Sequence, residues 1–181
     1  MDLRSEILRE HSKPQTLRIV QYVGNDKQRM KELMVLFLGN EYRITQRAAW
    51  PLSYIGIAHP DLVKPYDGKL LEFLQQQGAH DAVKRNILRL WGETMPSQKY
   101  WGELFDICYQ LARSKDEAVA IRTFAMQVMS NIVITYPELT FELKSLAEEL
   151  ILLGQPAFIS RGKKVLKLIE KSTQKKSHKR V

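Results

Sequence analysis

Arginine and proline recur along this chain at a spacing of about forty residues, and this repeat restricts the fold more than any other feature. The arginines recur at intervals of 38 and 37 residues, at Arg47, Arg85 and Arg122. The prolines recur at intervals of 36 and 41 residues, at Pro60, Pro96 and Pro137. A period of roughly 20 to 50 residues indicates a solenoid, in which each unit stacks on the next. The chain is therefore expected to be a row of similar units.

Each unit is expected to be a pair of helices, because apolar residues recur at intervals of three and four rather than two. The fold class is therefore all-α, a stack of antiparallel helix pairs. We expect one domain over residues 1–171, followed by a basic, disordered tail over 172–181. The predicted parts of the domain are a degenerate N-terminal pair at 14–38, repeats at 41–77, 81–113 and 116–153, and a capping helix at 156–171.

Four segments carry a family resemblance: Arg47 to Leu52 with its helix-interior Pro51, His59-Pro60-Asp61-Leu62, and the acidic starts at Asp81 and at Asp116. In these features the chain resembles the HEAT repeat family, within the armadillo-like group, over residues 41–153. The resemblance implies a right-handed α/α superhelix. It implies little about activity, since the family includes scaffolds, adaptors and a few enzymes.

An amphipathic helix pair cannot bury both apolar faces alone, so stacked units share one continuous core. Pro51 lacks a backbone donor and should kink its helix. The expected core residues are Leu33, Leu36, Phe37, Ile44, Ala48, Leu52, Ile55, Leu70, Leu74, Val83, Ile87, Leu90, Trp91, Trp101, Leu104, Phe105, Cys108, Val119, Met126, Met129, Leu143, Leu146 and Leu150.

The net charge of +8 comes from the C-terminal end, because residues 161–181 hold nine basic residues against Glu170 alone. Such an end could neutralise nucleic-acid phosphates or lie on an anionic surface. It could equally be a solubilising end. The candidate anion-binding residues are Lys163, Lys164, Lys167, Lys171, Lys175, Lys176, Lys179 and Arg180.

The second helix of each pair should line the concave side of a solenoid, and its exposed stripe is the predicted protein-binding surface. The candidate residues are Lys69, Glu72, Gln76, Glu103, Asp106, Gln110, Glu142 and Glu149. Because the later members lean acidic, we expect a basic peptide or helix as the partner. A solvated polar face without a partner explains the same pattern.

The repeated arginines have two interpretations. In the first, each pairs with an acidic side chain of a neighbouring unit and links the repeats. In the second, Arg47, Arg85 and Arg122 form a phosphate-binding row. We favour the first.

One constellation suggests an enzyme of a different class. Trp101 and Asp106 on one helix, with Arg122 on the next, resemble the DNA alkylation repeat family, whose solenoids hold a damaged nucleotide with aromatic residues and an aspartate. The family's pattern is closer to W-x3-D with a further tryptophan downstream, and the chain departs from both. Trp50 and Trp91 are expected in the core, and Asp106 at the solvated surface.

Other catalytic signals are absent from the sequence. The four histidines, at 11, 59, 80 and 178, form no metal-binding spacing, and no nucleotide-binding glycine loop occurs. Cys108 lies among apolar neighbours and is not expected to be a nucleophile. We therefore assign no catalytic residue, metal or cofactor.

A single cysteine and an N-terminus without an apolar secretory core favour a cytoplasmic protein. No apolar run approaches the roughly 20 residues of a membrane span. The sequence thus favours a non-catalytic HEAT-like adaptor or scaffold that binds a protein or peptide in its concave groove. The alternative is a nucleic-acid-binding solenoid, including a base-excision glycosylase.

Overall fold

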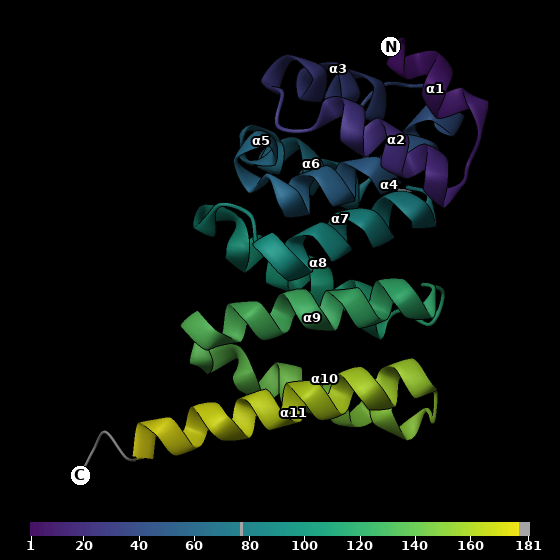
Figure 1. Ribbon diagram of the computed structural model, residues 1–181. Helices are drawn as coiled ribbons and strands as arrows, with labels where there is room; N and C mark the ends of the chain where they lie inside the picture. The colour runs from purple at the N-terminus through teal and green to yellow at the C-terminus, as the bar shows by residue number, and fades with distance from the viewer. Residues whose placement is uncertain (77, 178–181) are drawn as a thin grey trace. The chain divides into compact units, whose positions relative to one another are not determined.

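The computed structural model describes residues 1–76 and 78–177, with side chains up to residue 172, and every regular element in these residues is helical (Figure 1). The predicted all-α class is confirmed. Contacts between helices divide the chain into two compact units, Met1–Gln98 and Lys99–Val181. Each is described separately below.

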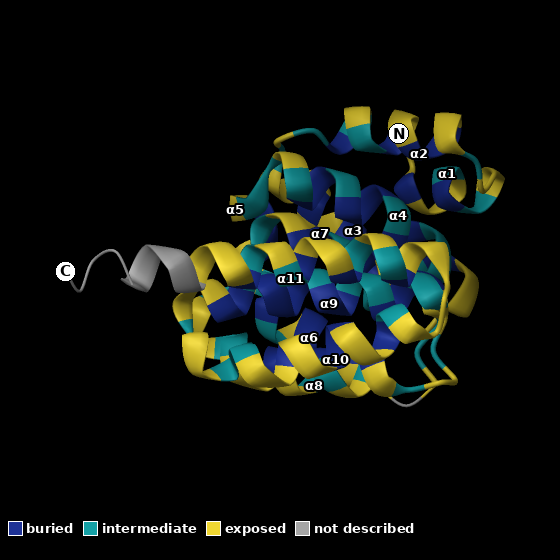
Figure 2. Ribbon diagram, turned by 90° about the horizontal axis from the view of Figure 1, so that it is seen from below, coloured by how far each residue is buried: buried dark blue, intermediate teal, exposed yellow. Residues whose placement is uncertain are grey.

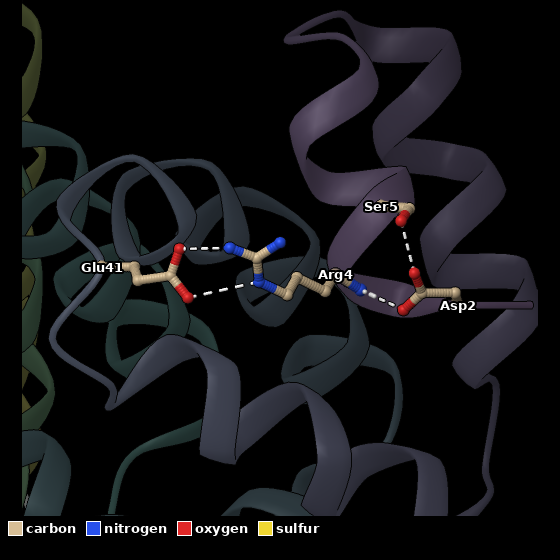
Figure 3. A network of polar contacts seen from close by, with 4 residues as sticks. All are labelled: Asp2, Arg4, Ser5 and Glu41. Atoms are coloured by element: carbon tan, nitrogen blue, oxygen red, sulfur yellow. Dashed lines mark hydrogen bonds and ion pairs between the residues drawn. The ribbon is translucent and has the colours of Figure 1, made fainter.

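Unit 1 begins with a short helix that the sequence pattern did not predict, α1 (Leu3–Arg9). The Asp2 carboxylate caps it by accepting hydrogen bonds from the Arg4 amide, at 3.2 Å, and from the Ser5 hydroxyl (Figure 3). Leu3 and Ile7 are buried, and α1 packs against α4 (Tyr42–Ala58). Seven residues are too few for a clear apolar period, which explains why sequence reasoning missed the helix.

The next two helices are α2 (Lys13–Val23) and α3 (Lys27–Phe37). Asp26 caps α3, accepting hydrogen bonds from the amides of Gln28 and Arg29. Both helices pack on α4, which carries Pro51 in its interior and also packs against α7 (Asp81–Thr94). The centre of unit 1 is therefore α4, surrounded by earlier and later helices.

The second helix of the predicted pair at 41–77 is interrupted. It consists of α5 (Pro60–Val63), the 3₁₀ turn η1 (Lys64–Tyr66) and α6 (Asp67–Gln75). Pro65 explains the break, because it has no amide hydrogen and its ring opposes the carbonyl four residues earlier. Asp67 is consequently the first residue of α6, and its carboxylate accepts hydrogen bonds from the amide and hydroxyl of Ser97, at 2.8 and 2.7 Å.

Unit 2 is built around α9 (Val119–Thr135), which contacts α8 (Trp101–Arg113), α10 (Thr140–Leu152) and α11 (Pro156–Ser177). The 3₁₀ turns η2 (Gln98–Tyr100) and η3 (Pro137–Leu139) precede α8 and α10. Figure 2 shows that most of α9 is buried. Its sequence is apolar on several faces, as expected of a helix covered by three others.

Helix α11 continues beyond its expected end at Lys171 as far as Ser177. Residues 172–177 were expected in a disordered tail, but their backbone is helical. A helix already formed by packing extends at little cost through lysine and glutamine, which have good helix propensity. Lys179 and Arg180 lie outside the described residues.

The predicted core is confirmed with four exceptions. Leu36, Trp50, Trp101 and Val119 are partly exposed, and the other expected core residues are buried. Phe158, which was not predicted, is fully buried in unit 2. The helical period therefore located the buried faces well, and its errors lie at their edges.

Two helical glycines of unit 2 should respond oppositely to substitution. A Cβ at Gly162 would lie 2.6 Å from Ile151 Cγ1 and 3.2 Å from the Ala147 carbonyl oxygen, whereas one at Gly102 meets nothing within 4 Å. Gly162→Val should lower the free energy of unfolding by about 1–3 kcal/mol through overpacking between α10 and α11. Gly102→Ala should raise it by up to about 1 kcal/mol. Urea unfolding measures both, and equal shifts would contradict this packing.

Candidate protein-binding surfaces

The predicted binding residues of unit 1 surround a shallow pocket. Lys69, Glu72 and Gln76 are exposed and line a pocket of about 470 Å³ with Leu38 and Phe73. The Phe73 ring meets Phe37 edge to face at 5.3 Å and is thereby held in place. Its lining combines polar side chains with the apolar Leu38 and Phe73. This part of the predicted stripe is accessible to a ligand, and binding there stays a prediction.

The remaining predicted binding residues lie on α8 and α10 of unit 2 and are all exposed: Glu103, Asp106, Gln110, Glu142 and Glu149. We call this set the acidic stripe. Helices α8 and α10 contact each other, so the stripe is shared by neighbouring helices. The described pockets of unit 2 do not include these residues.

A groove of unit 2 lies where the C-terminal end of α9, η3 and α11 meet. Two adjoining pockets, of about 180 and 400 Å³, share Ile134, Leu168 and Ser172. Val133, Pro137 and Ile169 complete an apolar floor, with Thr140 at its edge. Ile134 remains 61% exposed although it is a large aliphatic residue. We call this site the lysine-rimmed groove.

Three lysines of α11 form one edge of this groove. Lys164, Lys167 and Lys171 line the larger pocket, and their spacing of three and four places them on one face of α11. Glu170 is exposed on the same helix but is not part of the pocket lining. The groove thus combines an apolar floor with a positive edge.

The structure therefore separates the lysines that the charge pattern had grouped together. Lys163 is exposed but is not among the lining residues of the groove. Lys175 and Lys176 continue α11, where only the backbone is described. Three of the predicted anion-binding residues, Lys164, Lys167 and Lys171, therefore line the lysine-rimmed groove beside the apolar Ile134 and Leu168.

The favoured interpretation of the repeated arginines, as partners of acidic side chains, is wrong for two of them. The guanidinium of Arg47 donates to the carbonyl oxygen of Leu8, at 2.7 Å, at the end of α1. Arg122 is 7% exposed, and its Nε donates to the carbonyl oxygen of Ala112, at 2.8 Å, near the end of α8. Both satisfy carbonyls that a helix end leaves without intrahelical partners. Arg85 is exposed.

The predicted base-binding constellation is not assembled. Arg122 is buried, and its guanidinium carbon lies 4.8 Å from the centroid of the Phe158 ring, whereas Asp106 is exposed. Trp101 is partly exposed and meets Tyr136 edge to face at 6.2 Å. Of the other tryptophans expected in the core, Trp91 is buried and Trp50 is partly exposed. Trp101, Asp106 and Arg122 therefore do not face a common ligand site.

Cys108 is fully buried on α8, and burial raises the pKa of its thiol far above the ordinary value. The thiolate is the nucleophilic form, so it is scarce at neutral pH. We expect Cys108 in the folded chain to resist a disulfide reagent at pH 8 and to react quickly once denaturant unfolds the chain. A spectrophotometric thiol assay measures both rates. Rapid labelling without denaturant would contradict the burial.

Within the part of the chain that the structure describes, no three His, Cys, Asp or Glu side chains are grouped as metal ligands would be. None of the described helices combines the length and apolar character needed to cross a bilayer.

Sequence reasoning missed two surfaces. The lysine-rimmed groove joins residues more than thirty positions apart, of which only the lysines carried a visible signal. The second is a group of cations and aromatic rings in unit 1, around His11, Trp50 and Tyr54. The exposed Ile134, Phe141, Leu152 and Leu153 interrupt the expected pattern and could have indicated a surface on unit 2.

The family model described as HEAT repeat domain matches residues 3–169, which include both α1 and most of α11. The resemblance seen over residues 41–153 is thereby confirmed and extended to the N-terminal helices. No curated protein and no solved structure matches the chain.

Proposed function

The chain belongs to the HEAT repeat domain family, and from this premise we propose that it is a non-catalytic adaptor that binds another protein through the lysine-rimmed groove. HEAT repeats commonly mediate protein interactions. The observation that carries the proposal is the pairing of an apolar pocket with three lysines on one helix face.

The apolar floor supplies the driving force for binding. Ile134 and Leu168 line both pockets, so an apolar side chain from a partner would remove them from water. Burial of apolar area stabilises a complex by about 25 cal/mol per Å² before the cost of association is subtracted. A single large side chain, such as leucine or phenylalanine, fits the scale of these pockets.

The lysines determine which partner is favoured. Lys164, Lys167 and Lys171 would attract a segment with aspartate or glutamate beside its apolar anchor, and they would repel a basic segment. The proposed partner is therefore an acidic peptide segment with one large apolar residue. This differs from the basic partner expected at the acidic stripe, so the two sites predict opposite ligand charges.

A peptide-display selection on the full chain tests this proposal. Enriched peptides should combine a large apolar residue with neighbouring acidic residues. Replacing Lys164, Lys167 and Lys171 together by glutamate should weaken their binding by about thirtyfold or more, which corresponds to about 2 kcal/mol. Titration calorimetry with the enriched peptides measures the change.

Lys163→Glu is the matched control, because Lys163 lies on α11, is exposed and does not line the groove. Its affinity for the selected peptides should stay within a few-fold of the wild-type value. Enrichment of basic peptides that lose binding in an Asp106→Lys, Glu142→Lys variant would move the site to the acidic stripe. Equal losses in the triple variant and the control would also contradict the proposal.

A further inference from the structure

Unit 1 gathers four cations from three separate segments of the chain: Lys13 at the start of α2, Arg47 on α4, and Arg85 and Arg89 on α7. They surround three rings. His11 meets Trp50 edge to face at 5.6 Å, and the Arg89 guanidinium carbon lies 4.4 Å from the centroid of the Tyr54 ring. The charges of Arg47 and Arg85 act on His11, and those of Lys13 and Arg89 act on Tyr54. We call these four cations the cationic patch.

Two of the four cations, Arg47 and Arg89, are held in place by contacts that leave their charge unneutralised. Arg47 is fixed by backbone carbonyl oxygens of α1, and Arg89 by an aromatic face. Among residues 1–76 and 78–172, no carboxylate forms an ion pair with Lys13, Arg47, Arg85 or Arg89. Lys13 and Arg85 are exposed. The patch is therefore a positive surface whose four cations form no ion pair with a described carboxylate.

Other arginines of the same unit are compensated. The Arg4 guanidinium donates to both Glu41 carboxylate oxygens, at 3.2 and 2.6 Å (Figure 3). Arg29 stacks on Tyr22 at 4.4 Å, as Arg89 does on Tyr54, but it also lies 3.7 Å from the Asp26 carboxylate. Arg4 and Arg29 are thus paired with carboxylates, whereas the four cations of the patch form no such pair within the described residues.

The neighbouring titratable groups respond to this positive charge. Partial burial lowers the pKa of His11, and the charges of Arg47 and Arg85 lower it further. The pKa of Tyr54 is also lowered, first by its hydrogen bond with Arg89 and then by the charges of Arg89 and Lys13. The contributions of the neighbouring cations to both shifts reflect a local positive charge, which an anionic ligand would offset.

We propose that the cationic patch binds the sugar–phosphate backbone of a nucleic acid. A linear polyanion can meet several fixed cations at once and releases its counterions as it does so. Arg85 and Arg89 are one turn apart on α7, with Cβ atoms separated by about 5–6 Å, and so present two adjacent phosphate contacts. An anionic membrane fits less well, because interfacial binding also requires apolar side chains to insert, and Trp50 and Tyr54 are covered by His11 and Arg89.

This site is independent of the proposed function, because it lies in unit 1 and uses other residues. Fluorescence anisotropy of the full chain with a fluorescein-labelled DNA duplex tests it over a range of salt concentrations. The Arg85→Gln, Arg89→Gln variant should bind at least about tenfold more weakly at low salt, and its slope of log affinity against log salt should fall by about two. The Arg85→Lys, Arg89→Lys variant keeps the charge and should retain most of the affinity.

Arg29→Gln is the matched control, because it removes an arginine that stacks on tyrosine but is already paired with an acid. It should leave DNA affinity unchanged. Circular dichroism spectra and binding of groove-selected peptides should be unchanged in every variant, so that loss of folding is recognised. The proposal is overturned if wild type does not bind DNA, if only vesicles of anionic lipid are bound, or if replacing Lys175, Lys176, Lys179 and Arg180 by glutamine abolishes binding while the Arg85 and Arg89 changes do not.

Discussion

Replacing Trp91 by alanine is expected to lower the free energy of unfolding by about 3–5 kcal/mol, the usual cost of removing a large aromatic side chain from a core. Trp91 is 1% exposed on α7, the helix that packs most extensively on α4. Its removal leaves a cavity that rigid neighbouring helices can close only in part. Urea unfolding followed by far-ultraviolet circular dichroism measures the change.

Val35→Ala serves as the control for this prediction. Val35 is in the same unit on α3 but is 66% exposed, so its substitution should change stability by no more than about 0.5 kcal/mol. A Trp91→Ala chain that unfolds at the same urea concentration as the Val35→Ala chain would show that the α4–α7 contact is not a packed core.

In unit 2, Phe158→Ala should lower the free energy of unfolding by about 3–5 kcal/mol, again measured by urea unfolding. Phe158 is fully buried, and its ring lies against the guanidinium of Arg122, which is itself buried. The substitution therefore removes both apolar packing and the aromatic face that helps to accommodate a buried charge. The hydrogen bond from Arg122 to the Ala112 carbonyl would remain, but the guanidinium would lie beside a cavity.

Phe141→Ala separates burial from residue type. Phe141 is the same amino acid in the same unit but is 76% exposed, so its loss should cost no more than about 0.5 kcal/mol. Phe158→Leu should recover part of the lost stability by refilling the cavity. A small effect of Phe158→Ala, comparable to that of Phe141→Ala, would contradict the packing of α11 against α9.

The period of apolar residues predicted most of the helices and nearly all of the core. That success is physical, because the spacing of three and four decides which side of a helix can be buried. The apolar period did not predict the break at Pro65. A disturbance by proline was expected only at Pro51, in the first helix of the same pair. The short α1 offered too few residues for a period.

The partners of individual side chains could not be predicted in this way. Arg47 bonds to a carbonyl of a helix that sequence reasoning did not foresee, and Arg122 bonds to the end of α8 rather than to an acid. The groove at Ile134 and Leu168, like the cluster at His11, depends on tertiary packing of distant segments. Charge counting located the lysines of α11 but not the apolar floor beside them.

The central claim is that an acidic, apolar-anchored peptide occupies the lysine-rimmed groove. Amide chemical-shift mapping of the isotope-labelled full chain, titrated with a peptide from the display selection, tests it most directly. The account predicts that the largest shifts fall at Val133, Ile134, Leu168 and Ser172, and that they disappear in the Lys164, Lys167, Lys171 charge-reversal variant. Shifts centred on Glu103, Asp106 and Glu142, or unchanged in that variant, would contradict it.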